Sequence, residues 1–262
     1  MKILNQIFQK VIGDSFYKHH ANQNIDKKII LTFFISIFSL VAIFYLNSFQ
    51  KTLDFIHSLG FENITNCVIQ KTKNTTDFQL LDLSYWALCS FFFYFIAPFV
   101  VIRFIWKEPL SAYGFSLNEA TKGMKYYVLF LLFMLPLVWM VSYTNQFQNS
   151  YPFYKLQYPN ASLNHFIIWQ CFYFLQFLGL EFFFRGFMIH ALKIRFGFYA
   201  IFIMMIPYCM IHFGKPWPET IGAIFAGIIL GSMSLKSNSI WFGVLLHYSV
   251  AISMDIFSLM HQ

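Results

Sequence analysis

Four ionisable residues stand inside long apolar runs in the last third of the chain. Glu181 and Arg185 lie four residues apart in "GLEFFFRGF", and His212 and His247 follow in two later runs. A charged side chain in bilayer hydrocarbon costs about 2.5–3.5 kcal/mol on insertion scales, so such residues usually pair or serve a function. A desolvated carboxylate binds protons readily enough to act as a general base for water. We therefore predict that these four residues form a catalytic site.

The residue types suggest a role for each of the four. Glu181 is the predicted base or metal ligand, and Arg185, one helical turn further on, orients it. A histidine can hold a water molecule or a metal, and it can donate a hydrogen bond to an oxyanion. We expect His212 to hold the water molecule or the metal. We expect His247 to donate to the oxyanion or to serve as a second metal ligand. The sequence establishes no cofactor, but Glu181, His212 and His247 would suit a divalent metal such as zinc.

Each of these residues also has a structural interpretation. Glu181 and Arg185 could form an ion pair without any catalytic role, and a single histidine in a membrane is often a hydrogen-bonded packing residue. Their depths favour a shared site. At a rise of about 1.5 Å per residue, Glu181 lies ~18 Å, His212 ~21 Å and His247 ~16 Å from the inner end of its run. The three depths agree to within about one helical turn.

The composition indicates that apolar helices must hold these residues. Of the 262 residues, 58% are hydrophobic, 22% are aromatic and only 11% are charged. A soluble protein carries roughly 25% charged residues, so most of the surface of this chain must face lipid. The predicted fold class is all-α, a polytopic helical membrane protein. The formal net charge is +7, but the basic residues lie between the apolar runs and form no basic face, so we expect no nucleic-acid partner.

The apolar runs predict seven crossings in one bundle, since each is close to the ~20 residues that a membrane helix needs. An eighth could lie in the amphipathic region 107–126. The seven predicted spans are 29–46, 84–102, 127–144, 164–192, 197–213, 219–235 and 239–258.

The distribution of basic residues predicts the orientation of the chain. With the N-terminus inside, twelve of the 18 Lys and Arg residues fall in inner segments and five in outer ones, while Arg185 lies within a span. We divide the chain into a cytoplasmic amphipathic segment (1–28), N-terminal transmembrane helices and loops (29–163), and core helices that carry the four ionisable residues (164–258). The expected location is a plasma membrane, that of a bacterium, with a cytoplasmic N-terminus.

Three motifs resemble the CPBP family, the CAAX protease and bacteriocin-processing group of intramembrane proteases. That family has a Glu-Glu-x-x-x-Arg element, an aromatic-x-x-x-His element and a His-x-x-x-Asn/Asp element on successive membrane helices. Here "EFFFRG" supplies Glu181 and Arg185, "YCMIH" supplies Tyr208 and His212, and "SIWFGVLLH" ends at His247. The resemblance covers about 164–258, which makes this region the CPBP-like catalytic core.

Two positions depart from the family pattern. Leu180 stands where the family has its first glutamate, usually taken as the residue that activates water, and Ala251 stands where it has Asn or Asp. Asp255 lies ~12 Å beyond His247 along a helix axis, which is too far to replace the missing residue. We expect Asp255 to be an anchor at the outer end or a group that supports the site. We expect Glu181 to take over as the base.

The resemblance implies an intramembrane endopeptidase that uses activated water to cut a membrane-embedded or lipid-anchored protein, such as a CAAX-like substrate or one with a C-terminal sorting tail. Its partners would be membrane lipids and that substrate. The main alternative is a non-catalytic CPBP-fold scaffold or immunity-type binding protein, which the changes at Leu180 and Ala251 would suit. A transporter that relays protons is a weaker alternative, because the sequence has no repeat between its halves.

Overall fold

The computed structural model describes residues 26–73, 78–116, 124–157 and 161–261, and all regular elements in these ranges are helices. Six helical segments within them are long and apolar enough to cross a membrane, which confirms the prediction of a polytopic helical membrane protein. Four of them are single helices: α3 (Lys27–Leu46), α8 (Met124–Val141), α13 (Trp217–Ser237) and α14 (Trp241–Met260). The fifth is a continuous segment of α6 (Phe78–Phe91), η1 (Phe92–Ile96), α7 (Ala97–Val100) and η2 (Val101–Ile105). The sixth is a continuous segment of α10 (Leu163–Glu181), η5 (Phe182–Met188) and α11 (Ile189–Phe196).

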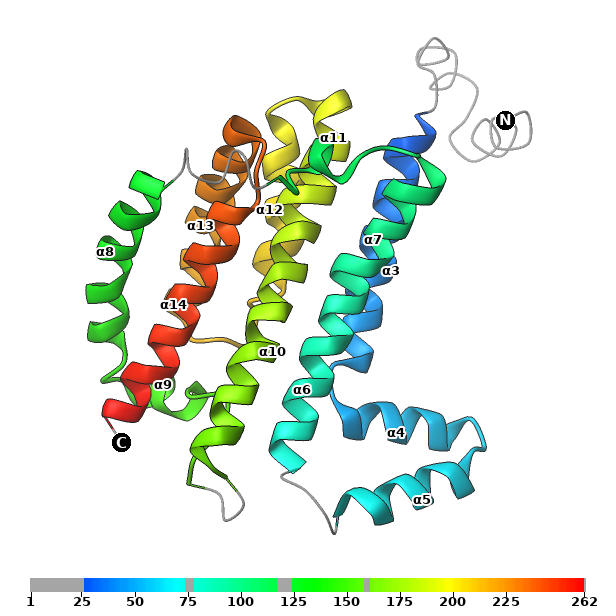
Figure 1. Cartoon of the computed structure of the whole chain (residues 1–262), viewed down its shortest axis with the longest axis vertical. Helices are drawn as coiled ribbons and strands as arrows, with labels where there is room; N and C mark the ends of the chain where they lie inside the picture. Colours follow the sequence, from blue (N-terminus) through cyan, green and yellow to red (C-terminus); the bar gives the residue numbers. More distant parts are fainter. Residues whose placement is uncertain (1–25, 74–77, 117–123, 158–160, 262) are drawn as a thin grey trace.

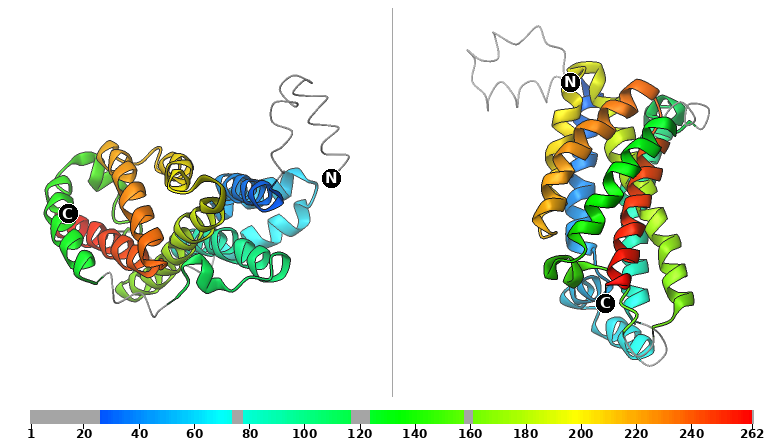
Figure 2. Two further views of the ribbon diagram at one scale, coloured as in Figure 1. Left: turned by 90° about the horizontal axis from the view of Figure 1, so that it is seen from above. Right: turned by 90° about the vertical axis from the view of Figure 1, so that its left-hand side faces the viewer.

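The run at 197–213 forms a shorter helix than the other predicted spans. Its helix, α12, covers only Tyr199–Met210, which is ~18 Å long where about 30 Å is needed. A left-handed glycine, Gly214, lies in the turn that follows, and α13 begins directly after Pro216. These turn residues therefore end the helix early. The views of Figures 1 and 2 show α12 and α13 as a hairpin whose connecting turn stops partway down the bundle.

Two other expectations fall largely outside the described residues. The amphipathic segment 1–28 is described only from residue 26, where Asp26 caps the N-terminus of α3 with its side chain. The region 107–126 is described up to residue 116, and that part contains a short 3₁₀ helix, η3 (Leu110–Tyr113), rather than the start of a span.

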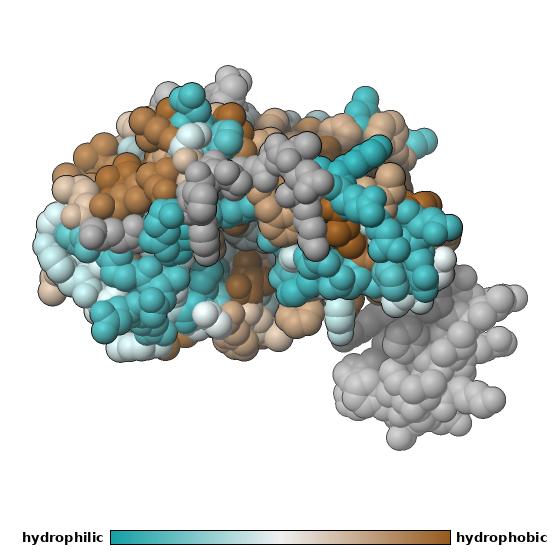
Figure 3. Space-filling model, turned by 90° about the horizontal axis from the view of Figure 1, so that it is seen from below, coloured by the Kyte–Doolittle hydropathy of each residue, from teal (hydrophilic) through white to brown (hydrophobic). Residues whose placement is uncertain are grey.

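The long α10–η5–α11 segment lies at the centre of the bundle. Figure 1 places α3 and α6 on one side of it and α8, α13 and α14 on the other. The first residues of α3 and the last residues of α14 lie at opposite ends of the bundle (Figure 1). Two short helices, α4 (Phe49–Ser58) and α5 (Glu62–Lys73), project sideways below α3 and α6. A further short helix is α9 (Asn145–Ser150). Seen from below, the end face of the bundle carries many hydrophilic residues (Figure 3).

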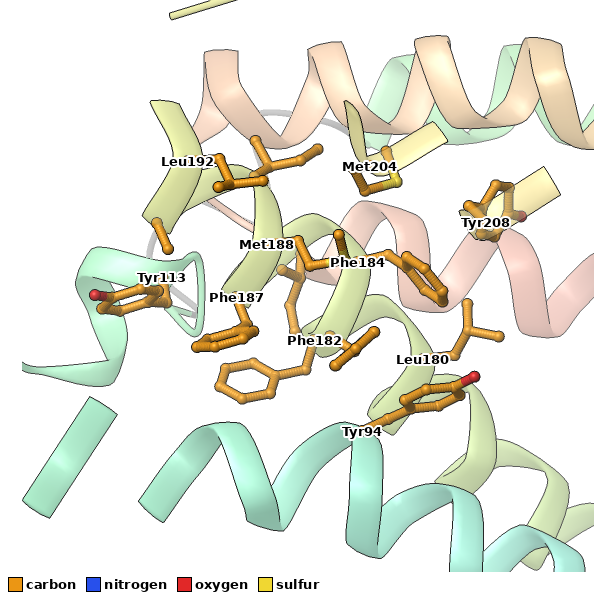
Figure 4. Close-up of a cluster of buried hydrophobic side chains, with 14 of the residues drawn as sticks. Tyr94, Tyr113, Leu180, Phe182, Phe184, Phe187, Met188, Leu192, Met204 and Tyr208 are labelled. Carbon is orange, nitrogen blue, oxygen red and sulfur yellow. The ribbon is translucent and has the colours of Figure 1, made fainter. Parts of the chain in front are cut away.

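The largest buried cluster surrounds η5 (Figure 4). Phe182, Phe183, Phe184 and Phe187 are all fully buried, so these rings pack inside the protein and do not face lipid. Tyr94 of η1 packs against two of them in tilted geometry, with ring centroids 4.6 Å from Phe183 and 5.7 Å from Phe184. This packing fixes the helix segment that carries the ionisable motif.

Candidate active site

The motif "EFFFRG" lies where the central helix changes its winding. Glu181 is the last residue of α10, and the seven residues after it form the π-helix η5. A π-helical turn contains extra backbone relative to an α-helix and occurs frequently at functional sites. Both Glu181 and Arg185 are fully buried, and Arg185 Nη1 lies 3.2 Å from Glu181 Oε1. The predicted pair is therefore formed, as two charges removed from water require.

A loop from the other half of the chain packs directly against this π-helix. A Cβ atom at Gly186 would lie 2.8 Å from the carbonyl oxygen of Tyr113, so only glycine allows the loop to approach this closely. Trp106 from the same loop stacks on Phe187 at 5.6 Å between ring centroids. These contacts hold the half of η5 that follows Arg185.

The backbone of η5 also has a hydrogen-bond partner on α13. Ser234 donates its hydroxyl hydrogen to the carbonyl oxygen of Arg185 at 3.0 Å, and His190 Nε2 lies 3.1 Å from the same hydroxyl oxygen. Because Ser234 has used its hydrogen, His190 Nε2 must be the donor. Lys193 in turn donates to His190 Nδ1 at 2.8 Å. His190 is therefore buried in a directed chain of hydrogen bonds that ends on the site helix.

His247 reaches the glutamate from α14. Its Nδ1 lies 3.0 Å from Glu181 Oε1, the same oxygen that contacts Arg185. The two predicted partners thus converge on one carboxylate oxygen although they belong to different helices. Among the described residues, the other oxygen, Oε2, has no hydrogen-bond partner. Oε2 is therefore the atom of Glu181 that can accept a proton from another molecule.

Tyr208 of α12 connects the remaining residues of the site. Its buried ring lies 3.8 Å below the Arg185 guanidinium carbon, which is a cation–π geometry. The ring centroid of Tyr208 is 4.8 Å from that of His212 and 6.3 Å from that of His247. Three of the four predicted site residues therefore lie around one tyrosine, and the fourth, Glu181, contacts two of those three.

The backbone determines the tautomer of His212, which lies in the turn after α12. Its Nδ1 is 2.8 Å from the carbonyl oxygen of Tyr208. A carbonyl only accepts, so Nδ1 carries the hydrogen and Nε2 of the neutral ring keeps a free lone pair. That lone pair can accept a hydrogen bond from water, as the predicted role requires.

The positions that depart from the family pattern contain only apolar packing. Leu180 belongs to the same buried cluster as Tyr94 and Tyr208 (Figure 4). Ala251 is buried in a second cluster with Trp169 and Phe177. Asp255 lies outside the site, where it accepts hydrogen bonds from Phe153 N at 3.1 Å and Gln170 Nε2 at 2.8 Å. It is an anchor for the loop before α10, in agreement with the sequence analysis.

The next feature is the arrangement of the three predicted metal ligands, Glu181, His212 and His247. In the parts of the chain that the structure describes, no group of three or more His, Cys, Asp and Glu side chains is placed to hold a metal ion. Glu181, His212 and His247 share a neighbourhood, but they do not form a three-ligand centre here. The zinc site stays a prediction, and the reaction below uses no step through a metal.

Sequence reasoning did not assign a role to Ser234, which supports the backbone of η5. A signal was present, because Ser234 is a polar residue in an apolar span and such residues often bond to neighbouring helices. The contact itself depends on how α13 is rotated toward η5, which the sequence does not reveal.

Comparison with known proteins gives one match. Residues 162–253 match the family described as Type II CAAX prenyl endopeptidase Rce1-like. No curated protein and no solved structure matches the chain significantly. The matched region begins at Ser162, the N-cap of α10, and ends within α14, so it contains all four predicted site residues and Tyr208. The match confirms the CPBP resemblance.

Proposed function

We propose that this integral membrane protein, whose residues 162–253 match the Type II CAAX prenyl endopeptidase Rce1-like family, is an intramembrane endopeptidase in which Glu181 activates the attacking water. One observation carries the proposal. The Glu181 carboxylate is fully buried, is bound through Oε1 to Arg185 and His247, and keeps Oε2 free of hydrogen bonds from the described residues. A purely structural ion pair has no need of a second helix that brings a histidine to the same oxygen.

The reaction begins with a water molecule between Glu181 Oε2 and the Nε2 lone pair of His212. Oε2 takes one proton from the water, and the resulting hydroxide attacks the carbonyl carbon of the scissile peptide bond. Arg185 keeps the carboxylate oriented while the proton is transferred. The carbonyl π electrons move to the oxygen, which becomes an oxyanion in the tetrahedral intermediate.

His247 stabilises that oxyanion in the proposed reaction. Its Nδ1 faces Glu181 Oε1, so its Nε2 is the ring atom available to the substrate. In the proposed reaction the His247 ring carries a hydrogen on both nitrogens: Nδ1–H donates to Glu181 Oε1, and Nε2–H donates to the oxyanion, while the proton taken from water stays on Oε2. The carboxyl proton then passes to the leaving nitrogen, the C–N bond breaks, and the products are a carboxylic acid and an amine.

The proposed substrate is a membrane-embedded or lipid-anchored protein, with a prenylated C-terminus as the leading case. The description of the matching family supports this choice. The depth of the site within an apolar bundle supports it as well, because a soluble peptide would have to leave water to reach Glu181. We further propose that the N-terminus is cytoplasmic and that the membrane is a bacterial plasma membrane. Zinc binding by Glu181, His212 and His247 would require these side chains to rearrange, because they do not form a three-ligand centre among the described residues; a bound ion would polarise the water or the carbonyl.

The test uses purified protein in detergent with one prenylated and one transmembrane reporter. Glu181→Gln removes the base while keeping the side chain's shape, and we expect peptidase activity to fall about 10²–10⁴-fold, the usual contribution of a general base. His212→Ala should lose activity as well. Glu219→Gln is the matched control, because Glu219 is bound by Tyr151 and Lys215 and lies outside the site. Metal analysis of the same wild-type sample tests for zinc at one ion per chain.

The apolar packing at Leu180 and Ala251 favours one other candidate, a non-catalytic scaffold or immunity-type binding protein. In that case wild-type protein and all variants would be equally inactive on both reporters and equally stable. Activity that survives in Glu181→Gln would instead show that another group activates the water.

A further inference from the structure

A glycine on α14 lies directly against the proposed base. A Cβ atom built at Gly243 would lie 3.0 Å from the carboxyl carbon of Glu181 and closer still to Oε2, well inside van der Waals contact. Gly243 has ordinary helical geometry, so no unusual backbone angle calls for glycine at this position. Alanine is also the better helix former. The glycine is therefore explained by the carboxylate that it faces.

Gly243 and His247 are one helical turn apart on the same face of α14. His247 binds Oε1 of Glu181, while the bare backbone at Gly243 leaves the room that Oε2 occupies. Glu181 cannot avoid a new methyl group by rotation alone, because its other oxygen is bound by both Arg185 and His247. A methyl group at position 243 would therefore press on a carboxyl group whose other oxygen faces His247 Nδ1 at 3.0 Å and Arg185 Nη1 at 3.2 Å.

The other described glycines on membrane helices face different neighbours. Gly227 and Gly231 of α13 meet apolar side chains of α12, and Gly179 meets the backbone of α6. These are the close contacts between small residues and neighbouring helices that membrane bundles commonly use. Among the described glycines, Gly243 is the one whose added Cβ would meet a carboxylate.

We infer that Gly243 is a positioning residue for catalysis: the missing side chain fixes Oε2 of Glu181 in the orientation that accepts the proton from water. The catalytic part of this inference rests on the proposed endopeptidase function, whereas the contact itself does not. A displacement of about 1 Å at a reacting group can reduce the rate about 10²-fold. Gly243→Ala should therefore lower kcat about 100-fold and leave KM nearly unchanged.

The decisive experiment compares Gly243→Ala with Gly222→Ala, a matched control on α13 where a Cβ would meet no atom within 4 Å. The control should keep wild-type kcat and unfold at or above the wild-type temperature because alanine favours the helix. Gly243→Ala should unfold at a lower temperature than the control, because its methyl group overpacks the buried carboxylate. The comparison of Gly243→Ala with Gly222→Ala is then repeated in protein that also carries Glu181→Asp. Aspartate is one methylene shorter and withdraws the carboxylate from position 243, so Gly243→Ala should cause little further loss there.

Infrared spectroscopy tests the contact in a protein that shows no peptidase activity. The Glu181 carboxyl band is identified by subtracting the spectrum of Glu181→Gln, and it should shift in Gly243→Ala but not in Gly222→Ala. Wild-type kcat in Gly243→Ala, an equal loss in the Glu181→Asp background, or an unshifted band would each overturn the inference. A shifted band in a protein inactive on every reporter would uphold the contact and refute the proposed function instead.

Discussion

Removal of Arg185 provides the sharpest test of how the site is held together. Arg185→Met keeps much of the side-chain volume but leaves the fully buried Glu181 carboxylate with only its contact to His247. Breaking a buried ion pair by removing one partner costs about 3–5 kcal/mol. Loss of the desolvated cation–π contact with Tyr208, at 3.8 Å, is worth up to about 2 kcal/mol.

The two losses overlap, since both come from one guanidinium group, and His247 still partners the carboxylate. We therefore expect Arg185→Met to lower the free energy of unfolding by about 3–4 kcal/mol, near the low end of the range for a broken pair. The double variant Glu181→Gln/Arg185→Met removes both charges, so it should recover about 2 kcal/mol relative to Arg185→Met.

The assay is reversible unfolding of the purified protein in mixed micelles, followed by circular dichroism, for wild type, both single variants and the double variant. The double-mutant cycle isolates the coupling between the two residues. A loss below about 1 kcal/mol in Arg185→Met would contradict the reasoning, because an exposed pair would lose that little. Additive losses in the double variant would likewise show that the two groups do not interact.

Two further predictions concern contacts outside the site. Asp255→Ala removes one hydrogen bond to the loop before α10, from Phe153 N, and one to α10 itself, from Gln170. It should lower the free energy of unfolding by about 1.5–3 kcal/mol and selectively increase hydrogen exchange of residues 151–157. The second concerns pH. Burial raises the pKa of Glu108, but hydrogen bonds from Lys28 and Tyr113 outweigh it and hold the pKa below its ordinary 4.5. The stabilisation is then present above pH 4.5 and is lost as the pH falls through the lower folded pKa. The difference in Tm between wild type and Glu108→Gln should shrink below pH 4.5, and a constant difference would count against the Lys28 pairing.

Part of the site could be predicted because it depends on the order of residues along the chain. Charges in apolar runs are rare enough to select Glu181, Arg185, His212 and His247 from the sequence, and helix rise places three of them at similar depth. The fold class follows from composition for a similar reason, since so few charged residues cannot cover a soluble surface. Neither conclusion needs any knowledge of which helices touch.

The length of the helix in the run 197–213 could not be predicted from hydropathy alone. The run 197–213 is as apolar as its neighbours, yet turns shorten its helix to Tyr199–Met210 and fold it back against α13. Hydropathy measures the cost of contact with lipid, and an apolar segment packed against protein meets that requirement equally well. For the same reason, hydropathy could not show whether the phenylalanines of "EFFFRGF" face lipid or pack in the core, because both environments are apolar.

The sequence by itself determined the class of the protein, the residues able to do chemistry and their common depth. Only the tertiary structure decided which carboxylate oxygen is bound and which is free, that Tyr208 joins Arg185 to the histidines, and that Gly243 makes room for Oε2. The physical reason is that the rotation of each helix about its own axis decides which way its side chains point. Composition and rise fix how far along its axis a residue lies, whereas the direction in which its side chain points depends on a π-helical turn and on the packing of neighbouring helices.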